Sequence, residues 1–197
     1  MPRGPAPEGR VLCRSGLTAL PESYTEAMDS TELVIRPART QDVQAIRALV
    51  EPLARERVLL QKEAVAYYEA IQEFMVAEAP DGTLAGFGAL HVIWEDIAEV
   101  RTLATSSQWR GHGVGHRILD RLLDRARALG VTRVFCLTFE VDFFSRHGFS
   151  VMADQSVVDP EVYSELLRSQ DEGVAEFLDL ARVKPNTLGN TRMIITL

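Results

Sequence analysis

Arg110-Gly111-His112-Gly113-Val114-Gly115 is the stretch that decides the fold, and it follows the apolar run 97–105 after a four-residue spacer. Glycines in such a turn let the backbone approach a ligand closely. The apolar residues behind it recur at helical spacing, so the turn predicts the start of a helix. The N–H groups and dipole of a helix N-terminus favour a pyrophosphate, and Arg110 can add a charge-assisted contact. The stretch therefore predicts a strand–turn–helix unit that binds an anionic ligand.

Two other kinds of phosphate-binding loop do not fit this stretch. A P-loop needs Gly-Lys-Ser or Gly-Lys-Thr, and neither tripeptide occurs here. A Rossmann fingerprint would follow the first strand of a parallel βαβ unit. Here the two strand-like runs 84–92 and 97–105 precede the turn, and the short loop between them predicts an antiparallel pair.

The rest of the chain predicts a mixed α/β (α+β) fold, with a largely antiparallel early sheet followed by the strand–turn–helix–strand core. Beside 84–92 and 97–105, strands are expected at 33–36, 74–77, 131–138 and 193–197. Helices are expected at 42–50, 63–71, 142–147, 161–168 and 171–180, besides the long helix that ends before Gly130.

The length of 197 residues suits one domain, which we place at 32–197. Residues 1–31 are rich in Pro, Gly, Ser, Thr and Glu with few large apolar side chains, which predicts a disordered tail. Met28 stands just before the first strand, and we hypothesise that it is the physiological start.

Composition excludes several classes of function. The net charge of −7 and pI of about 5.2 argue against a nucleic-acid binder, which needs a basic face. No apolar run approaches the roughly 18 residues of a membrane span, so no membrane association is expected. Two widely separated cysteines, Cys13 and Cys136, form no ligand motif and indicate a reducing, cytoplasmic setting.

The spacing Arg-x-x-Gly-x-Gly at Arg110, Gly113 and Gly115 resembles the acetyl-CoA loop of the GNAT superfamily of N-acetyltransferases. The segment Phe143-Phe144-x-x-x-Gly148-Phe149 looks like the short helix and closing strand of that superfamily. The resemblance covers roughly residues 33–151 and implies acetyl-CoA as co-substrate, with no metal. The spacing of His112 and His116 is metal-like, but no third ligand completes a site.

A closer resemblance is to the acetyltransferase domain of the N-acetylglutamate synthases. The residues that carry it are Val34-Ile35-Arg36-Pro37-Ala38-Arg39-Thr40-Gln41-Asp42-Val43, Pro52-Leu53, Val58-Leu59-Leu60, Gly88-Ala89-Leu90, Ala98-Glu99-Val100 and Val134-Phe135-Cys136-Leu137-Thr138. The chain looks like the short, single-domain bacterial form. The resemblance implies acetyl transfer to the α-amino group of L-glutamate, the first step of arginine biosynthesis. Because the kinase-like domain that binds arginine in the longer enzymes is absent, arginine feedback is not implied.

This family resemblance also assigns roles in the reaction. Glu99 is expected to be the general base, through a water molecule. A backbone N–H of Leu103 or Ala104 is expected to stabilise the oxyanion, and the same strand to pair with pantetheine through Thr105. The residues expected to bind the cofactor are Leu103, Ala104, Thr105, Arg110, Gly111, His112, Gly113, Val114 and Gly115.

Cations are needed for the carboxylates of a dicarboxylic acceptor. Arg101 has i, i+2 spacing to Glu99 and so shares its face of the strand. Lys62 lies where the synthases carry a basic pair, and Arg192 lies just before the last strand. Phe144 occupies the position of a tyrosine acid in many family members, so no tyrosine is expected to protonate the leaving thiolate.

Other functions stay open at this point. The acceptor could be glutamine or another small amine, although a polyamine would require an acidic pocket. A non-catalytic acyl-CoA-binding regulatory module is a third alternative, supported only by Phe144. A homodimer is an expectation from the resemblance.

Overall fold

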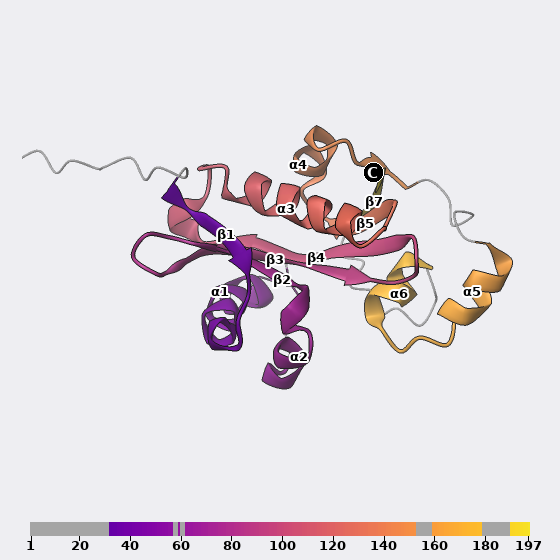
Figure 1. The fold of residues 1–197 in the computed structure, drawn as a ribbon, viewed down its shortest axis with the longest axis horizontal. Coiled ribbons are helices and arrows are strands. Elements are labelled where there is room, and N and C mark those ends of the chain that lie inside the picture. Colours follow the sequence, from indigo (N-terminus) through magenta and orange to yellow (C-terminus); the bar gives the residue numbers. More distant parts are fainter. Residues whose placement is uncertain (1–31, 57–58, 60–61, 153–158, 179–189) are drawn as a thin grey trace, which may run out of the picture.

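A seven-stranded sheet forms the centre of the computed structural model, which describes residues 32–56, 59, 62–152, 159–178 and 190–197 (Figure 1). The strand order is β1-β2-β3-β4-β5-β7-β6, and only β4 and β5 pair in parallel among the described strands. This mixed, mostly antiparallel sheet confirms the predicted fold class. The strands are β1 (Val34–Pro37), β2 (Phe74–Glu78), β3 (Leu84–Val92), β4 (Ile97–Thr105), β5 (Arg133–Thr138), β6 (Ser150–Val151) and β7 (Thr191–Thr196).

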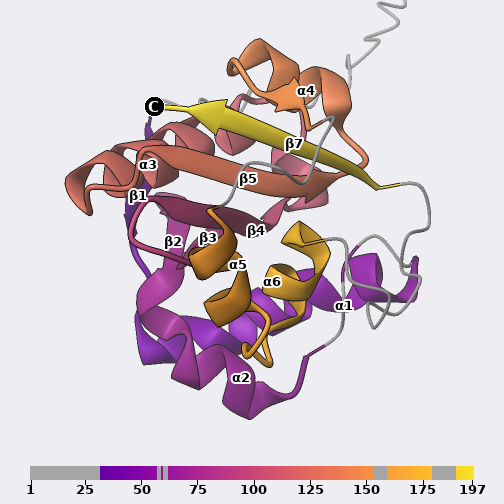
Figure 2. The same cartoon turned by 90° about the vertical axis from the view of Figure 1, so that its right-hand side faces the viewer.

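Helices cover both faces of the sheet (Figures 1 and 2). On one face lie α3 (Val114–Ala128) and α4 (Val141–Arg146). On the other lie α1 (Val43–Arg55), α2 (Ala64–Glu69) and α6 (Glu172–Phe177), with α5 (Pro160–Leu166) beside α6. Short 3₁₀ turns at Thr40–Asp42, Ile71–Glu73 and Ser107–Trp109 complete the described elements.

The two faces bury separate apolar clusters. The apolar stripe predicted on the long helix α3 is buried against the sheet, with Ile118, Leu119 and Leu122 inaccessible to solvent. Its last expected member, Leu129, lies beyond the helix end and is exposed. Burying side chains of this size contributes roughly 1.5–3 kcal/mol each. On the opposite face, α1 packs its own apolar residues against β2 and β3, and Phe177 of α6 packs against Phe135 of β5 with ring centroids 5.2 Å apart. This last contact fixes α6 over the middle of the sheet.

A few expectations differ from the structure at element ends. The helix expected at 63–71 ends at Glu69, because the chain turns through a 3₁₀ turn before entering β2. The strand expected at 131–138 begins at Arg133, since the N–H of Val131 still bonds to Ala126 of α3. The predicted tail 1–31, with Met28 and Cys13, lies outside the described residues. Among the described helices, none has the length and apolar character needed to cross a membrane.

Candidate functional site

The glycine turn has the backbone geometry predicted for an anion-binding loop. Gly111 and Gly113 adopt left-handed conformations with φ of 83° and 75°, which favour glycine over other residues. Gly113 is the N-cap of α3, and no side chain caps the helix there. The N-terminal N–H groups of α3 are therefore open to an external acceptor. The adjacent Arg110 is exposed, so its charge can reach the same ligand.

The parallel strands β4 and β5 separate just before this turn. Their pairing runs from Ile97↔Arg133 to Val100↔Cys136, whereas β4 continues to Thr105. The edge of β4 beyond Val100 is thus open on its β5 side. Gly115 at the start of α3 is close to the Phe143 ring and to the Thr105 hydroxyl, which places the open edge next to the glycine turn.

A β-bulge interrupts β4 within this open segment. Phe87 pairs with Ala104 and Ala89 pairs with Arg101, so two residues of β4 lie opposite one residue of β3. Thr102 takes the strain, with a φ of 57° that is rare for a β-branched residue. A bulge leaves its extra residue outside the ladder and re-aims the side chains beyond it. As a result Arg101 and Thr102, though consecutive, line the same cavity.

That cavity lies on the face of the sheet covered by α2 and α6, and its volume is about 290 Å³. Its walls come from the segment before α2, the turn before β2, strands β3 and β4, and the residue before α6. The polar residues that line it are Lys62, Glu69, Glu73, His91, Arg101, Thr102 and Asp171. The cavity therefore carries both carboxylates and cations.

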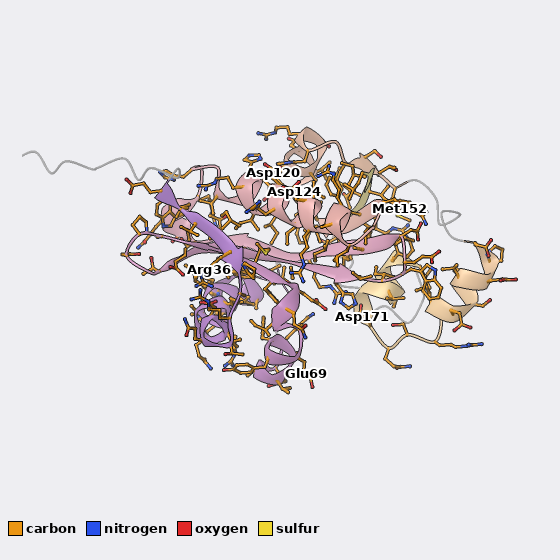
Figure 3. The ribbon with its side chains drawn as sticks, viewed as in Figure 1. Arg36, Glu69, Asp120, Asp124, Met152 and Asp171 are labelled. Atoms are coloured by element: carbon orange, nitrogen blue, oxygen red, sulfur yellow. The ribbon has the colours of Figure 1, made fainter. Side chains whose placement is uncertain are left out.

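Arg101 is held by two carboxylates on this face. Its Nε donates to Oε2 of Glu99 at 2.9 Å, and its Nη1 and Nη2 donate to Asp171 at 3.2 and 3.0 Å. Asp171 lies at the start of α6, beneath the strands (Figure 3). Burial opposes the charge of Arg101, but the two carboxylates outweigh it and raise the pKa of Arg101. The predicted proximity of Glu99 and Arg101 on one face is present, and Asp171 is a third partner.

Glu99 lies beneath this arrangement and is only 5% exposed. Burial raises the pKa of its carboxyl, while the charge of Arg101 partly offsets the rise. Gly173 of α6 packs directly against it, because a Cβ at this position would overlap Oε2 of Glu99 and lie 2.9 Å from Nη2 of Arg101. Glu99 is not among the residues that line the cavity. The base role predicted for Glu99 stays a prediction, and it would need a path past Arg101.

A second pair of side chains faces the cavity from β3 and the turn before β2. Nδ1 of His91 lies 2.7 Å from Oε1 of Glu73, and Nε2 of His91 lies 3.8 Å from Oδ2 of Asp171. The His91 side chain is 25% exposed. His91 pairs with Glu99 across the β3–β4 ladder, so the two side chains emerge on the same face.

The other predicted residues lie at varied distances from the cavity. Lys62 lines it together with Arg101. Arg192 lies on β7, two strands away from β4, and pairs with Leu137 of β5. It is not among the residues that line the cavity. Phe144 is 5% exposed and packs edge-on against Phe149, so the position predicted to lack an acid carries no ionisable group.

Several residues in and beside the cavity were not predicted from the sequence, among them Glu73, Asp171 and Gly173. Glu73 ends the short 3₁₀ turn before β2 and Asp171 lies far along the chain from β4, so neither shares a sequence pattern with that strand. The only local signal is Asp171 as a helix-capping residue, whose Oδ1 accepts from the N–H of Val174. In the part of the chain that the structure describes, no cluster of three or more His, Cys, Asp or Glu residues could hold a metal.

The model of the acetyltransferase (GNAT) family matches residues 43–149. The chain belongs to this family. An amino-acid acetyltransferase of Mycobacterium tuberculosis is 53% identical over 175 residues, which is 88% of this chain and 99% of that relative. A relative of the same name from Neisseria meningitidis is 34% identical over 137 residues, which is only 31% of its length.

Solved structures of the GNAT family share the fold. Rv2747 from Mycobacterium tuberculosis, solved in complex with CoA, is 55% identical with a TM-score of 0.78, over 83% of this chain and 99% of that one. N-acetylglutamate synthase from Neisseria gonorrhoeae, solved with coenzyme A and N-acetyl-glutamate, has 26% identity and a TM-score of 0.67 over 84% of this chain and 35% of that one. The predicted family and fold are therefore confirmed, and the names of the relatives agree with the predicted class of enzyme.

Proposed function

We propose that this protein transfers the acetyl group of acetyl-CoA to the α-amino group of an amino acid, with L-glutamate as acceptor. The observation that carries the proposal is the mixed charge of the cavity beside the open edge of β4. Glu73 and Asp171 present carboxylates to it, and Lys62 presents a cation. An α-amino acid is a zwitterion, and such a cavity complements both of its charges. A polyamine would instead require carboxylates alone.

The glycine turn and the open strand edge supply the co-substrate site. The N–H groups at the start of α3, with Arg110 and the turn Gly111–Gly115, would hold the pyrophosphate of acetyl-CoA. The unpaired edge of β4 from Leu103 to Thr105 would bond to the pantetheine arm. A backbone N–H of Leu103 or Ala104, beside the bulge, would stabilise the tetrahedral oxyanion. Bound acetyl-CoA supplies the thioester whose carbonyl carbon the amine attacks.

The acceptor carboxylates need cations on the cavity side of the sheet. Lys62 is exposed at the cavity wall and suits the side-chain carboxylate. Arg192 pairs with Leu137 and so projects from the same face as Phe135 and Glu99, across the gap between β4 and β5. We assign the second carboxylate to it. Arg101 already balances Glu99 and Asp171, so it contributes shape and hydrogen bonds more than net charge.

The position of the short helix α4 where many family members carry a tyrosine supplies no acid for the leaving thiolate, and Ser145 beside it would be only a weak substitute. Phe144 has no hydroxyl, and its ring is buried in the core. A thiolate is a fair leaving group, since a thiol has a pKa of about 8.5. It would therefore depart unassisted or take a proton from water.

A steady-state assay of CoA release over the twenty amino acids and two polyamines tests this proposal. Glutamate should give the highest kcat/KM, and Lys62→Ala should raise the KM for glutamate about 10-fold while leaving kcat within about 3-fold. The control is Arg168→Ala, which removes an exposed cation just after α5 and outside the cavity and should change neither constant. A polyamine as best substrate would overturn the amino-acid acceptor, and CoA binding without any turnover would favour the regulatory module.

We also propose a cellular compartment and an oligomeric state for the protein. The paucity of cysteine supports a cytoplasmic enzyme of amino-acid biosynthesis. A homodimer is proposed from the family resemblance alone, and size-exclusion chromatography with light scattering would test it.

A further inference from the structure

His91 has the surroundings of a general base. Its ring lines the cavity, and its Nδ1 lies 2.7 Å from a carboxylate oxygen of Glu73. An ionised carboxylate only accepts hydrogen bonds, so the proton of a neutral ring is assigned to Nδ1. The lone pair then lies on Nε2. At 3.8 Å from Oδ2 of Asp171, Nε2 is beyond hydrogen-bond distance and remains able to accept a proton from a bound molecule.

The acceptor must lose protons before it can react. An α-amino group is mostly protonated near neutral pH, and only its neutral form has a lone pair for attack. The carboxylates of Glu73 and Asp171 flank the His91 ring and attract an ammonium group to it. The same carboxylates then face the imidazolium that forms. An imidazole whose second nitrogen bonds to a carboxylate is the arrangement that orients a histidine base in hydrolytic triads.

Glu99 is less well placed for this role. Its Oε2 accepts from Nε of Arg101 at 2.9 Å and lies 2.6 Å from Nη2, and Gly173 covers it from the other side. A base has to lie within hydrogen-bond reach of the proton it removes, directly or through one water molecule. Arg101 and His91 both line the cavity, whereas Glu99 does not and its Oε2 is bonded to Arg101.

We propose that His91 is the general base of the reaction and that Glu73 is the residue that positions it. This inference rests on the proposed acetyltransferase function and replaces Glu99 as the base. Nε2 of His91 takes one proton from the α-ammonium, and the nitrogen lone pair forms the C–N bond to the acetyl carbon. The C–S bond breaks with its electron pair on sulfur. The nitrogen gives up its second proton to water, the thiolate departs unassisted or takes a proton from water, and His91 returns its proton to water.

The charged groups that face the ring come from several elements, and they shape its pH dependence. They are Glu73 in the turn before β2, Glu99 and Arg101 on β4, Asp171 before α6, Lys62 before α2 and Glu69 at the end of α2. Glu99, Asp171 and Arg101 form one paired cluster, whereas Glu73 lies directly against the ring. A base that must be neutral to accept a proton predicts an acidic limb in the kcat/KM profile, and this limb should disappear in His91→Ala.

The test measures kcat, KM and their pH profiles for His91→Ala, with and without added imidazole. His91→Ala should lower kcat about 100-fold or more at pH 7.5, with the KM for acetyl-CoA within about 2-fold. Added imidazole should restore at least about 10-fold of the lost rate, and the acidic limb should follow the rescuing imidazole. If His91→Ala does not fold, as judged by circular dichroism, His91→Gln replaces it and should show the same loss without rescue.

Glu73 is tested separately because its role is positional. Glu73→Gln should lower kcat about 10-fold and shift the acidic limb, whereas Glu73→Asp should recover part of the rate. The matched control is Glu165→Gln, which removes an exposed carboxylate of α5 outside the cavity and should leave kcat within about 2-fold. A rate for His91→Ala within about 3-fold of wild type, or an acidic limb lost in Glu99→Gln but kept in His91→Ala, would overturn the assignment. A wild-type protein that releases no CoA would overturn the proposed function itself.

Discussion

The substitution Gly173→Ala places a methyl group where α6 meets the buried Glu99. The added Cβ would overlap Oε2 of Glu99 and lie 2.9 Å from Nη2 of Arg101 and 3.0 Å from Cδ of Glu99. Cβ atoms in proteins essentially never approach other atoms within 3.0 Å, so either α6 or the Glu99 side chain must move on the order of 1 Å. Neither can yield easily, because both are buried and the Glu99 carboxylate is tied to Arg101.

Two opposing terms decide the size of the effect. Alanine gains about 0.5–1 kcal/mol over glycine in a helix, because it restricts the unfolded chain. Overpacking a well-filled site costs about 1–3 kcal/mol. We therefore expect a net loss of about 1–2 kcal/mol in the free energy of unfolding, or a fall in Tm of about 2–8 °C for a domain of this size. The displaced Arg101 should also lower kcat for glutamate.

Thermal unfolding followed by circular dichroism, without substrates, measures this loss. The control is Gly115→Ala in α3, where the added Cβ would lie 3.5 Å from the Phe143 ring and 3.6 Å from the Thr105 hydroxyl, an ordinary contact. It should be as stable as wild type or slightly more stable. The reasoning is refuted if Gly173→Ala is also as stable as wild type, since α6 would then not pack closely on Glu99.

Two further predictions concern other buried groups. Asp42→Asn removes a carboxylate that accepts from Nη1 and Nη2 of Arg36 at 2.7 and 2.9 Å, so unfolding free energy at pH 7 should fall by about 2 kcal/mol in denaturant titrations. The hydrogen bond from Arg36 holds the pKa of Asp42 below its usual value, so this contribution is full above about pH 4 and is lost as pH falls through the lowered pKa. A difference in unfolding free energy between wild type and variant that is as large at pH 2 as at pH 7 would contradict this. Burial raises the pKa of the Cys136 thiol, so a thiol reagent at pH 8 should modify Cys136 only in denaturant. Peptide mass mapping would detect the modification, and labelling of Cys136 in the native protein would contradict the packing of β5.

The sequence predicted the strand–turn–helix unit well, for identifiable reasons. The ranges 84–92 and 97–105 are mainly apolar runs bounded by turn residues, and they coincide with β3 and β4. Gly111 and Gly113 indicated a turn, and both adopt the left-handed conformation that glycine takes without strain. The stripe of the following helix has the period of a buried helix face, and α3 buries it as expected.

The bulge in β4 could not be predicted in this way. The strained residue is Thr102, a β-branched residue that normally favours regular strand. Its conformation comes from the mismatch of β3 and β4, which no local pattern encodes. Because the bulge determines which side chains face the cavity, the sequence also could not predict on which face of the sheet Thr102 lies.

The charge cluster around Arg101 was predicted only in part. The i, i+2 spacing of Glu99 and Arg101 was enough to place them on one face. Asp171 joins them because α6 folds back across the sheet, and this packing depends on apolar contacts such as that between Phe135 and Phe177. The sequence contains the residues of such a cluster, but it does not show that folding brings them into contact.

The most direct test of the account is a competition among acceptors. The purified protein would be incubated with acetyl-CoA and an equimolar mixture of the twenty amino acids, and the products identified by mass spectrometry. The account predicts N-acetylglutamate as the main product, at a yield that matches the CoA released, and a loss of that product in His91→Ala. A different acetylated amino acid as the main product, or no acetylated amino acid at all, would contradict it.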